Sequence, residues 1–224
     1  MTRVAVTTTA DNAPRVGDAL VAVGLVPVML PCISISPSPP AILDELRQRA
    51  ASADLILVTS ARAVRVTWPD RDMPPVPVAA VGEATADAVR DARGLIEVVG
   101  SGGAAELISE LDVEGRSIVF PHARAADPAT AVELEKRGAA MFAAAAYDTI
   151  PIAPGDEKVD AAVFGSPSAV DGWLLRRHLD GMTIAAMGDT TASALRVRGV
   201  ADPVVPDRPD LVTLAHALAE RIDA

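Results

Sequence analysis

Two short segments place a glycine three residues before a threonine, at matching points of two related stretches of the chain. They run from Gly82 to Thr85 and from Gly188 to Thr191, and each follows a short apolar run typical of a buried strand. The free N–H groups at a helix start bind carboxylate or phosphate, and glycine lets such a ligand approach the backbone closely. Thr85, Thr190 and Thr191 would add hydroxyl donors. These segments therefore predict two anion-binding turns.

Two serines hold a second pair of matching positions. Ser60 follows the apolar run LILVT, and Ser166 follows AAVFG at an offset of 106 residues. Together with Pro167 and Ser168, they are candidates for contacts to the same acidic ligand. The alternative is that both serines only cap helices, with Pro167 in the favoured first helical position. The sequence leaves both interpretations open.

A lone tyrosine and a few basic residues complete the candidate chemistry. Tyr147 is the only tyrosine and ends an apolar run. A phenol at the end of a strand can donate a proton to a leaving oxygen, although a tyrosine packed only for its shape would fit the same pattern. Arg15, Arg62, His122 and Arg124 are the basic residues expected near strand ends. They could meet acidic groups of a ligand, or simply be solvated surface charges.

An internal repeat positions these residues. VAAVGEATADAVR (78–90) aligns with IAAMGDTTASALR (184–196), with seven of 13 positions identical. A second pair of related segments, 3–31 and 116–147, matches Gly24 with Gly138. Short apolar runs alternate with helical patterns along the chain, as in a parallel sheet built from strand–helix–strand units. The repeat predicts two similar α/β domains of the flavodoxin-like kind, whose matched strand ends line the cleft between them.

The order of the repeated segments predicts that one domain is inserted into the other. We expect a discontinuous domain of residues 1–34 and 152–224, and an inserted domain of residues 37–147. The segments 31–40, rich in proline and serine, and 147–155 would be connectors. Because the chain passes twice between the domains, these connectors are expected to form a two-stranded hinge.

Composition excludes several classes of function. The net charge of −10 disfavours nucleic acid or an anionic membrane as partner. One cysteine, Cys32, and three scattered histidines form no disulfide and no recognisable metal site. There is no nucleotide-binding glycine motif, no long apolar run and no signal-peptide pattern at the start. We expect a cytoplasmic protein without cofactor or metal, and nothing in the sequence requires more than a monomer.

In combination, these segments resemble the uroporphyrinogen-III synthase family. The shared features, in chain order, are T-S-x-x-A-V (59–64), V-G-x-x-T-A (81–86), G-G-A-A-E-L (102–107), a strand ending in a lone tyrosine (147), S-P-S-A-V (166–170) and G-x-T-T-A-x-A-L (188–195). The resemblance covers nearly the whole chain. The chain departs from the family pattern at four places, which are Thr7 to Thr9, Arg62, Gly165, and Pro121 with His122.

The resemblance implies an enzyme that needs no cofactor. Its substrate would be hydroxymethylbilane, a linear tetrapyrrole with eight carboxylates, which loses its terminal hydroxyl as water and closes with ring D inverted to give uroporphyrinogen III. Tyr147 would assist departure of that hydroxyl. Two other functions stay open: a cytosolic two-lobed sensor that binds a small molecule without turnover, and a regulatory domain derived from a synthase.

Overall fold

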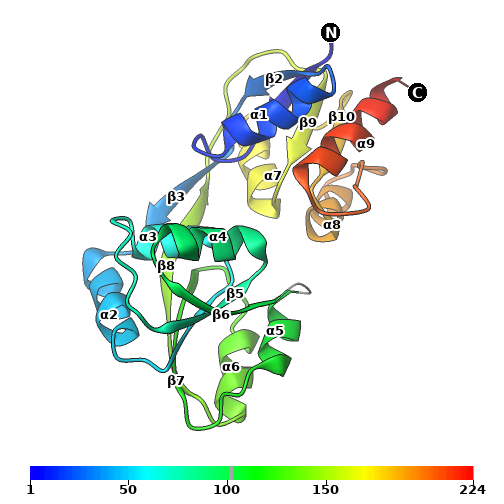
Figure 1. The fold of residues 1–224 in the computed structure, drawn as a ribbon. Helices are drawn as coiled ribbons and strands as arrows, with labels where there is room; N and C mark the ends of the chain where they lie inside the picture. The colour runs from blue at the N-terminus through cyan, green and yellow to red at the C-terminus, as the bar shows by residue number, and fades with distance from the viewer. Residues whose placement is uncertain (101–102, 224) are drawn as a thin grey trace. The chain divides into compact units, whose positions relative to one another are not determined.

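The structure is a computed structural model that describes residues 1–100 and 103–223, so Gly102 at the start of the G-G-A-A-E-L segment lies outside the described residues. The chain forms two compact units. We call Met1–Ile35 with Thr149–Ala224 the split unit, and Ser36–Asp148 the inserted unit. Each has one sheet with helices on both faces (Figure 1). The expected α/β class with two parallel sheets is confirmed.

The split unit contains a four-stranded parallel sheet in the order β10-β9-β1-β2. Its strands are β1 (Arg3–Val6), β2 (Val26–Met29), β9 (Ala161–Phe164) and β10 (Thr183–Ala186). Its helices are α1 (Ala13–Ala22), α7 (Pro167–Leu174), α8 (Asp189–Val197) and α9 (Leu211–Asp223). The strand expected near Val204 is a single bridge to Ala185.

Successive side chains of β1 point to opposite faces of this sheet, as the pleat requires. Val4 and Val6 pack with Leu20 of α1 and Leu218 of α9 on one face. Ala5 packs on the other face, in a cluster with side chains of α7 and α8. Both faces are therefore covered, which explains why the strands read as continuous apolar runs.

The inserted unit contains most of a six-stranded sheet in the order β3-β8-β7-β4-β5-β6. Its strands are β3 (Ile33–Pro37), β4 (Leu55–Val58), β5 (Pro77–Val81), β6 (Leu95–Gly100), β7 (Ser117–Ala123) and β8 (Ala140–Pro151). Its helices are α2 (Pro40–Ala50), α3 (Ala61–Thr67), α4 (Glu83–Asp91), α5 (Ala104–Glu110) and α6 (Ala129–Lys136). Leu107 of α5 and Leu134 of α6 pack in one cluster with Leu55, Leu57 and Phe120 of the sheet.

Four neighbouring strands of the inserted sheet have the same arrangement in space as the four strands of the split unit. The chain passes through them in a different sequence. Strands β10, β9, β1 and β2 of the split unit correspond to β5, β4, β7 and β8 of the inserted unit. The strand–helix–strand segment that opens the split unit closes the inserted one, so the inserted unit is a circular permutation of the other. Gly24 and Gly138 end the corresponding helices with positive φ values of 80° and 88°, which glycine adopts without strain.

The two segments expected as connectors contain strand residues, since β3 lies within 31–40 and β8 continues to Pro151. Ser38 N donates to Ala146 O at 2.9 Å, and Ile152 N donates to Cys32 O at 2.8 Å. Since the partner number falls as the residue number rises, β3 runs antiparallel to β8. The alternation of isoleucine and serine over 33–36 was the signal for this strand.

Two other elements differ from their expected lengths. The strand expected at Val98–Val99 extends over Leu95–Gly100, and Glu97 interrupts its apolar pattern because β6 lies at the edge of the sheet. The helix expected over 167–179 ends at Leu174. The chain then folds back, and Trp173 Nε1 donates to His178 O at 2.9 Å.

Candidate functional site

Each sheet has a switch point, where neighbouring parallel strands lead into connections that run in opposite directions. Ligands of open α/β sheets bind beyond the carboxyl ends of the strands at such points. The switch point lies between β1 and β9 in the split unit, and between β7 and β4 in the inserted unit. The candidate serines follow two of these strands: Ser166 follows β9 and Ser60 follows β4.

The structure brings Ser60 and Tyr147 of the inserted unit together. Ser60 Oγ and Tyr147 Oη are 3.1 Å apart, and Ser60 Oγ also accepts a hydrogen bond from Arg62 N at 3.1 Å. Only 6% of Tyr147 is exposed. Ser60 therefore caps α3 as one interpretation held, and its hydroxyl holds the phenol in addition.

His122 and Arg124 lie on the adjoining segment at the end of β7. His122 Nδ1 is 2.7 Å from Ala123 O, and its ring packs against Phe120. Arg124 N donates to Tyr147 O at 2.8 Å, while its guanidinium lies 3.4 Å from Asp148 Oδ2. The Arg124 side chain is 59% exposed. A basic side chain therefore lies beside the strand that carries the phenol.

Gly82 follows β5 and begins α4. Its φ of 78° and ψ of 153° lie in a region essentially restricted to glycine. A Cβ placed on Gly82 would meet no atom within 4 Å among the residues described, so space for a ligand lies beside this backbone. Thr85 is almost fully buried, with 5% of its surface exposed. The backbone amides of this turn are also available to an anion.

The split unit presents the corresponding elements without a tyrosine. Ser166 caps α7 by accepting from Ala169 N at 3.3 Å, with Pro167 in the first turn. Ser168 follows in the same turn. Both predicted serine caps therefore form, whatever else these serines bind.

Gly188 begins α8 in an extended conformation, with φ of −174° and ψ of 179°. No described atom lies within 4 Å of a Cβ placed there. Thr191 is 4% exposed, whereas Thr190 is exposed. Thr190 therefore lies at the surface of this turn. Arg15 lies exposed in the first turn of α1.

Thr7 lies at one of the four places where the chain departs from the family pattern. It is 1% exposed, and its hydroxyl donates to Val163 O at 2.7 Å. This bond ties the ends of β1 and β9 together at the switch point of the split unit. We infer that Thr7 supports the site without contacting a ligand, a role that no pattern in the sequence indicated.

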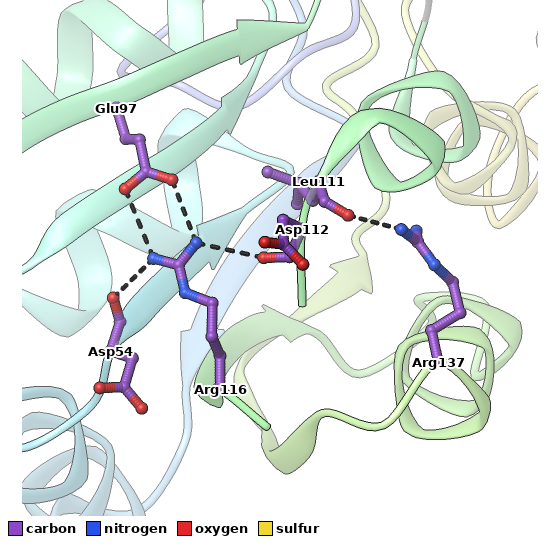
Figure 2. A network of polar contacts seen from close by, with 6 residues as sticks. All are labelled: Asp54, Glu97, Leu111, Asp112, Arg116 and Arg137. Atoms are coloured by element: carbon purple, nitrogen blue, oxygen red, sulfur yellow. Dashed lines mark hydrogen bonds and ion pairs between the residues drawn. The ribbon is translucent and has the colours of Figure 1, made fainter. Parts of the chain in front are cut away.

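A polar network joins strands of the inserted unit near their amino ends, at the end of the sheet opposite to Ser60. Arg116 donates to Asp54 O at 2.9 Å and forms an ion pair with Glu97 at 3.2 Å (Figure 2). Hydrogen bonds from the Ser117 hydroxyl and then from the Ser117 backbone lower the pKa of Asp54. This network joins β4, β6 and β7 far along their strands from Ser60. The sequence analysis did not single out these residues.

Metal and thiol chemistry find no support at either switch point. Over residues 1–100 and 103–223, no three His, Cys, Asp or Glu side chains are grouped to hold a metal ion. Burial raises the pKa of the Cys32 thiol to about 12, against a smaller opposing effect of the Arg177 charge. Since the thiolate is the reactive form, this raised pKa disfavours Cys32 as a nucleophile at neutral pH. In the same described residues, no helix is long and apolar enough to span a membrane.

The fold defines a class: α/β proteins with two flavodoxin-like units. Comparison with known families goes further. Residues 15–216 match the family model described as Uroporphyrinogen-III synthase HemD, so the chain belongs to that family. No curated protein matches the chain.

Solved structures with the same fold cover both chains almost completely. A mutant uroporphyrinogen III synthase from the extremely thermophilic bacterium Thermus thermophilus is 22% identical with a TM-score of 0.64, covering 100% of this chain and 99% of its own. The uroporphyrinogen-III synthetase from Helicobacter pylori 26695 is 18% identical with a TM-score of 0.67, covering 99% of both chains. The wild-type Thermus protein is 21% identical with a TM-score of 0.52, covering 100% and 98%.

Proposed function

We propose that this protein is a uroporphyrinogen-III synthase, which converts hydroxymethylbilane into uroporphyrinogen III with loss of water and inversion of ring D. Family membership and the fold support the assignment. The observation that carries it is the pairing of Tyr147 with Ser60 at the switch point of the inserted unit. The reaction requires no partner chain, cofactor or membrane, and we propose a monomeric, cytoplasmic enzyme.

The substrate carboxylates would be bound mainly by backbone amides. Both Gly82 and Gly188 begin helices beside open space, and both are followed by N–H groups without partners inside the helix. Ser166, Ser168 and Thr190 add hydroxyls in the split unit. Such local donors would act at short range against the net charge of −10, and also against the carboxylates of Glu83 and Asp189 in the first turns of α4 and α8.

Basic side chains would add to these contacts in the inserted unit. Arg124 is more than half exposed beside the strand that carries Tyr147. We propose that Arg62, Arg124 and His122 meet carboxylates near the reacting end of the substrate, and that Arg15 meets one in the split unit. Several contacts from defined directions would hold a flexible chain in the conformation that inverts ring D.

Tyr147 would act when the hydroxyl leaves. The electron-rich pyrrole expels the terminal hydroxyl, the C–O bond breaks, and the phenol of Tyr147 donates the proton that makes water of it. The resulting cation is attacked by ring D to form a spiro intermediate, which rearranges to the inverted macrocycle. The proton lost when the ring regains aromaticity restores the phenol, so that the net change is the loss of one water.

The proposal is tested by supplying freshly made hydroxymethylbilane and separating the oxidised products into type I and type III uroporphyrin. Type I forms spontaneously, so it is the internal control in every reaction. We expect type III in excess, in proportion to the amount of protein. Type I alone, at the spontaneous rate, would overturn the synthase assignment and favour a non-catalytic sensor or a regulatory domain.

A further inference from the structure

Ser60 lies between two polar groups in the inserted unit. Its Oγ is 3.1 Å from Arg62 N and 3.1 Å from Tyr147 Oη. Ser60 is partly buried and Tyr147 is 6% exposed. The three groups therefore form a short chain from a backbone amide, through a hydroxyl, to the phenol.

One hydrogen bond of this chain has a fixed direction, while between Ser60 Oγ and Tyr147 Oη either hydroxyl can donate. The amide of Arg62 can only donate, so Ser60 Oγ accepts there. The single proton of Ser60 remains, and Tyr147 Oη is placed to accept it at hydrogen-bond distance. A hydroxyl that accepts from an amide is polarised into a stronger donor. The reverse direction would leave the Ser60 proton without this acceptor.

We propose that Ser60 donates to Tyr147 and thereby leaves the phenol proton directed away from the protein interior, toward the oxygen that departs. Ser60 is then a positioning residue that acts through Tyr147. When the phenol gives up its proton, the same Ser60 O–H stabilises the phenolate. This inference rests on the proposed function for its chemical meaning, but the proton direction is a property of the unliganded protein.

The other unit supplies a matched control. Ser166 caps α7 by accepting from Ala169 N, as Ser60 caps α3 by accepting from Arg62 N. The hydroxyl partner of Ser60 is Tyr147, the only tyrosine of the chain, so Ser166 has no second phenol to hold. Replacing Ser166 therefore removes the same kind of cap without touching the pair of Ser60 and Tyr147.

The test is Raman spectroscopy of the full-length, unliganded protein. The Fermi doublet of a tyrosine ring distinguishes a phenol oxygen that accepts a strong hydrogen bond from one that donates, and here it reports Tyr147 alone. We expect the accepting pattern in the wild-type protein and in Ser60→Thr, loss of that pattern in Ser60→Ala, and no change in Ser166→Ala. A donating pattern in the wild type, or an unchanged doublet in Ser60→Ala, would overturn the inference.

Kinetics with hydroxymethylbilane give a second measurement. A hydrogen bond to a developing charge corresponds to about 10–100-fold in rate, so we expect Ser60→Ala to lower kcat by about that factor and Ser60→Thr to restore most of it. A loss confined to KM would overturn the positioning role. If the wild-type protein shows the accepting doublet yet forms no type III product, the proton direction stands and the proposed function fails.

Discussion

At the amino ends of their central strands, the two units are built alike. Asp54 N donates to Ser117 O at 2.9 Å, and Ser117 N donates back to Asp54 Oδ2 at 2.8 Å. In the split unit, Asp160 N donates to Arg3 O at 2.8 Å, and Arg3 N donates back to Asp160 Oδ2 at 2.8 Å. Each aspartate thus ties the start of its own strand to the neighbouring strand.

At the carboxyl ends the two units differ. Gly82 has a φ of 78°, whereas Gly188 has an extended φ of −174° that any residue adopts. Ser60 contacts a phenol within its own unit, and the split unit has no tyrosine to offer Ser166. The hydrogen bonds at the amino ends are thus alike in the two units, whereas the carboxyl ends, where open sheets bind ligands, differ in these details. We propose that both carboxyl edges bind substrate, and that proton donation belongs to the inserted unit alone.

The largest effect is expected at Tyr147. Tyr147→Phe removes the proposed proton donor and keeps the ring, so we predict a fall in kcat of about 10²–10⁴-fold with slow residual formation of type III product. The check is the rate of type III uroporphyrin formation at saturating hydroxymethylbilane. Full activity in this variant would remove the phenol from the mechanism.

The two turn glycines provide a smaller contrast in stability. Gly82→Ala forces a side chain into a backbone region essentially restricted to glycine, so we predict a loss of about 1–3 kcal/mol in the free energy of unfolding. Gly188→Ala adopts its extended conformation without strain and without a close contact, and we predict little change. Denaturant unfolding of both variants measures the difference. Equal losses would show that the two turns are constrained in the same way.

The smallest effect concerns the amino edges and depends on pH. Hydrogen bonds from Ser117 lower the pKa of Asp54 in the folded protein. The Asp54 carboxylate therefore stabilises the fold at pH values above its ordinary pKa of 3.8. That stabilisation is lost as the pH falls through the lower, folded-state value. We predict that Asp54→Asn lowers the thermal midpoint at pH 7, and that its difference from wild type shrinks in acid below pH 3.8.

Asp160→Asn is the matched variant for this measurement. The Asp160 carboxylate accepts from Arg3 N, whereas that of Asp54 accepts from both Ser117 N and the Ser117 hydroxyl. The shift at pH 7 should therefore be smaller for Asp160→Asn. If the difference in thermal midpoint between Asp54→Asn and the wild-type protein stays constant with pH, the assigned hydrogen bonds are contradicted.

The sequence predicted the α/β class, because buried parallel strands leave long apolar runs and the repeat revealed a second copy. It did not predict β3, since the prolines and serines of 31–40 obscured the alternation from Ile33 to Ser36. Pairing with the long strand β8 decides that segment, and such a partner is invisible in local composition. Local pattern is thus a weaker guide wherever a long-range partner determines the structure.

For the site, the sequence identified Ser60 and Tyr147 separately, 87 residues apart. Only the pairing of β8 with β7 beside β4 brings them together. The sequence also offered Thr85 and Thr191 as ligand donors; both residues are almost fully buried, and their role stays a prediction. Thr85 lies on the same helix face as the buried Ala88, and Thr191 on the same face as the buried Leu195. Helical periodicity alone therefore indicates that both threonines lie on the inner face of their first turn.

The division of work between the carboxyl edges is tested most directly by measuring kcat and KM of Gly188→Ala beside Tyr147→Phe with hydroxymethylbilane. Loss of binding alone raises KM, and loss of a contact made only in the transition state lowers kcat. We predict a raised KM with kcat nearly unchanged for Gly188→Ala, and a lowered kcat with KM nearly unchanged for Tyr147→Phe. The same pattern in both variants would contradict the account.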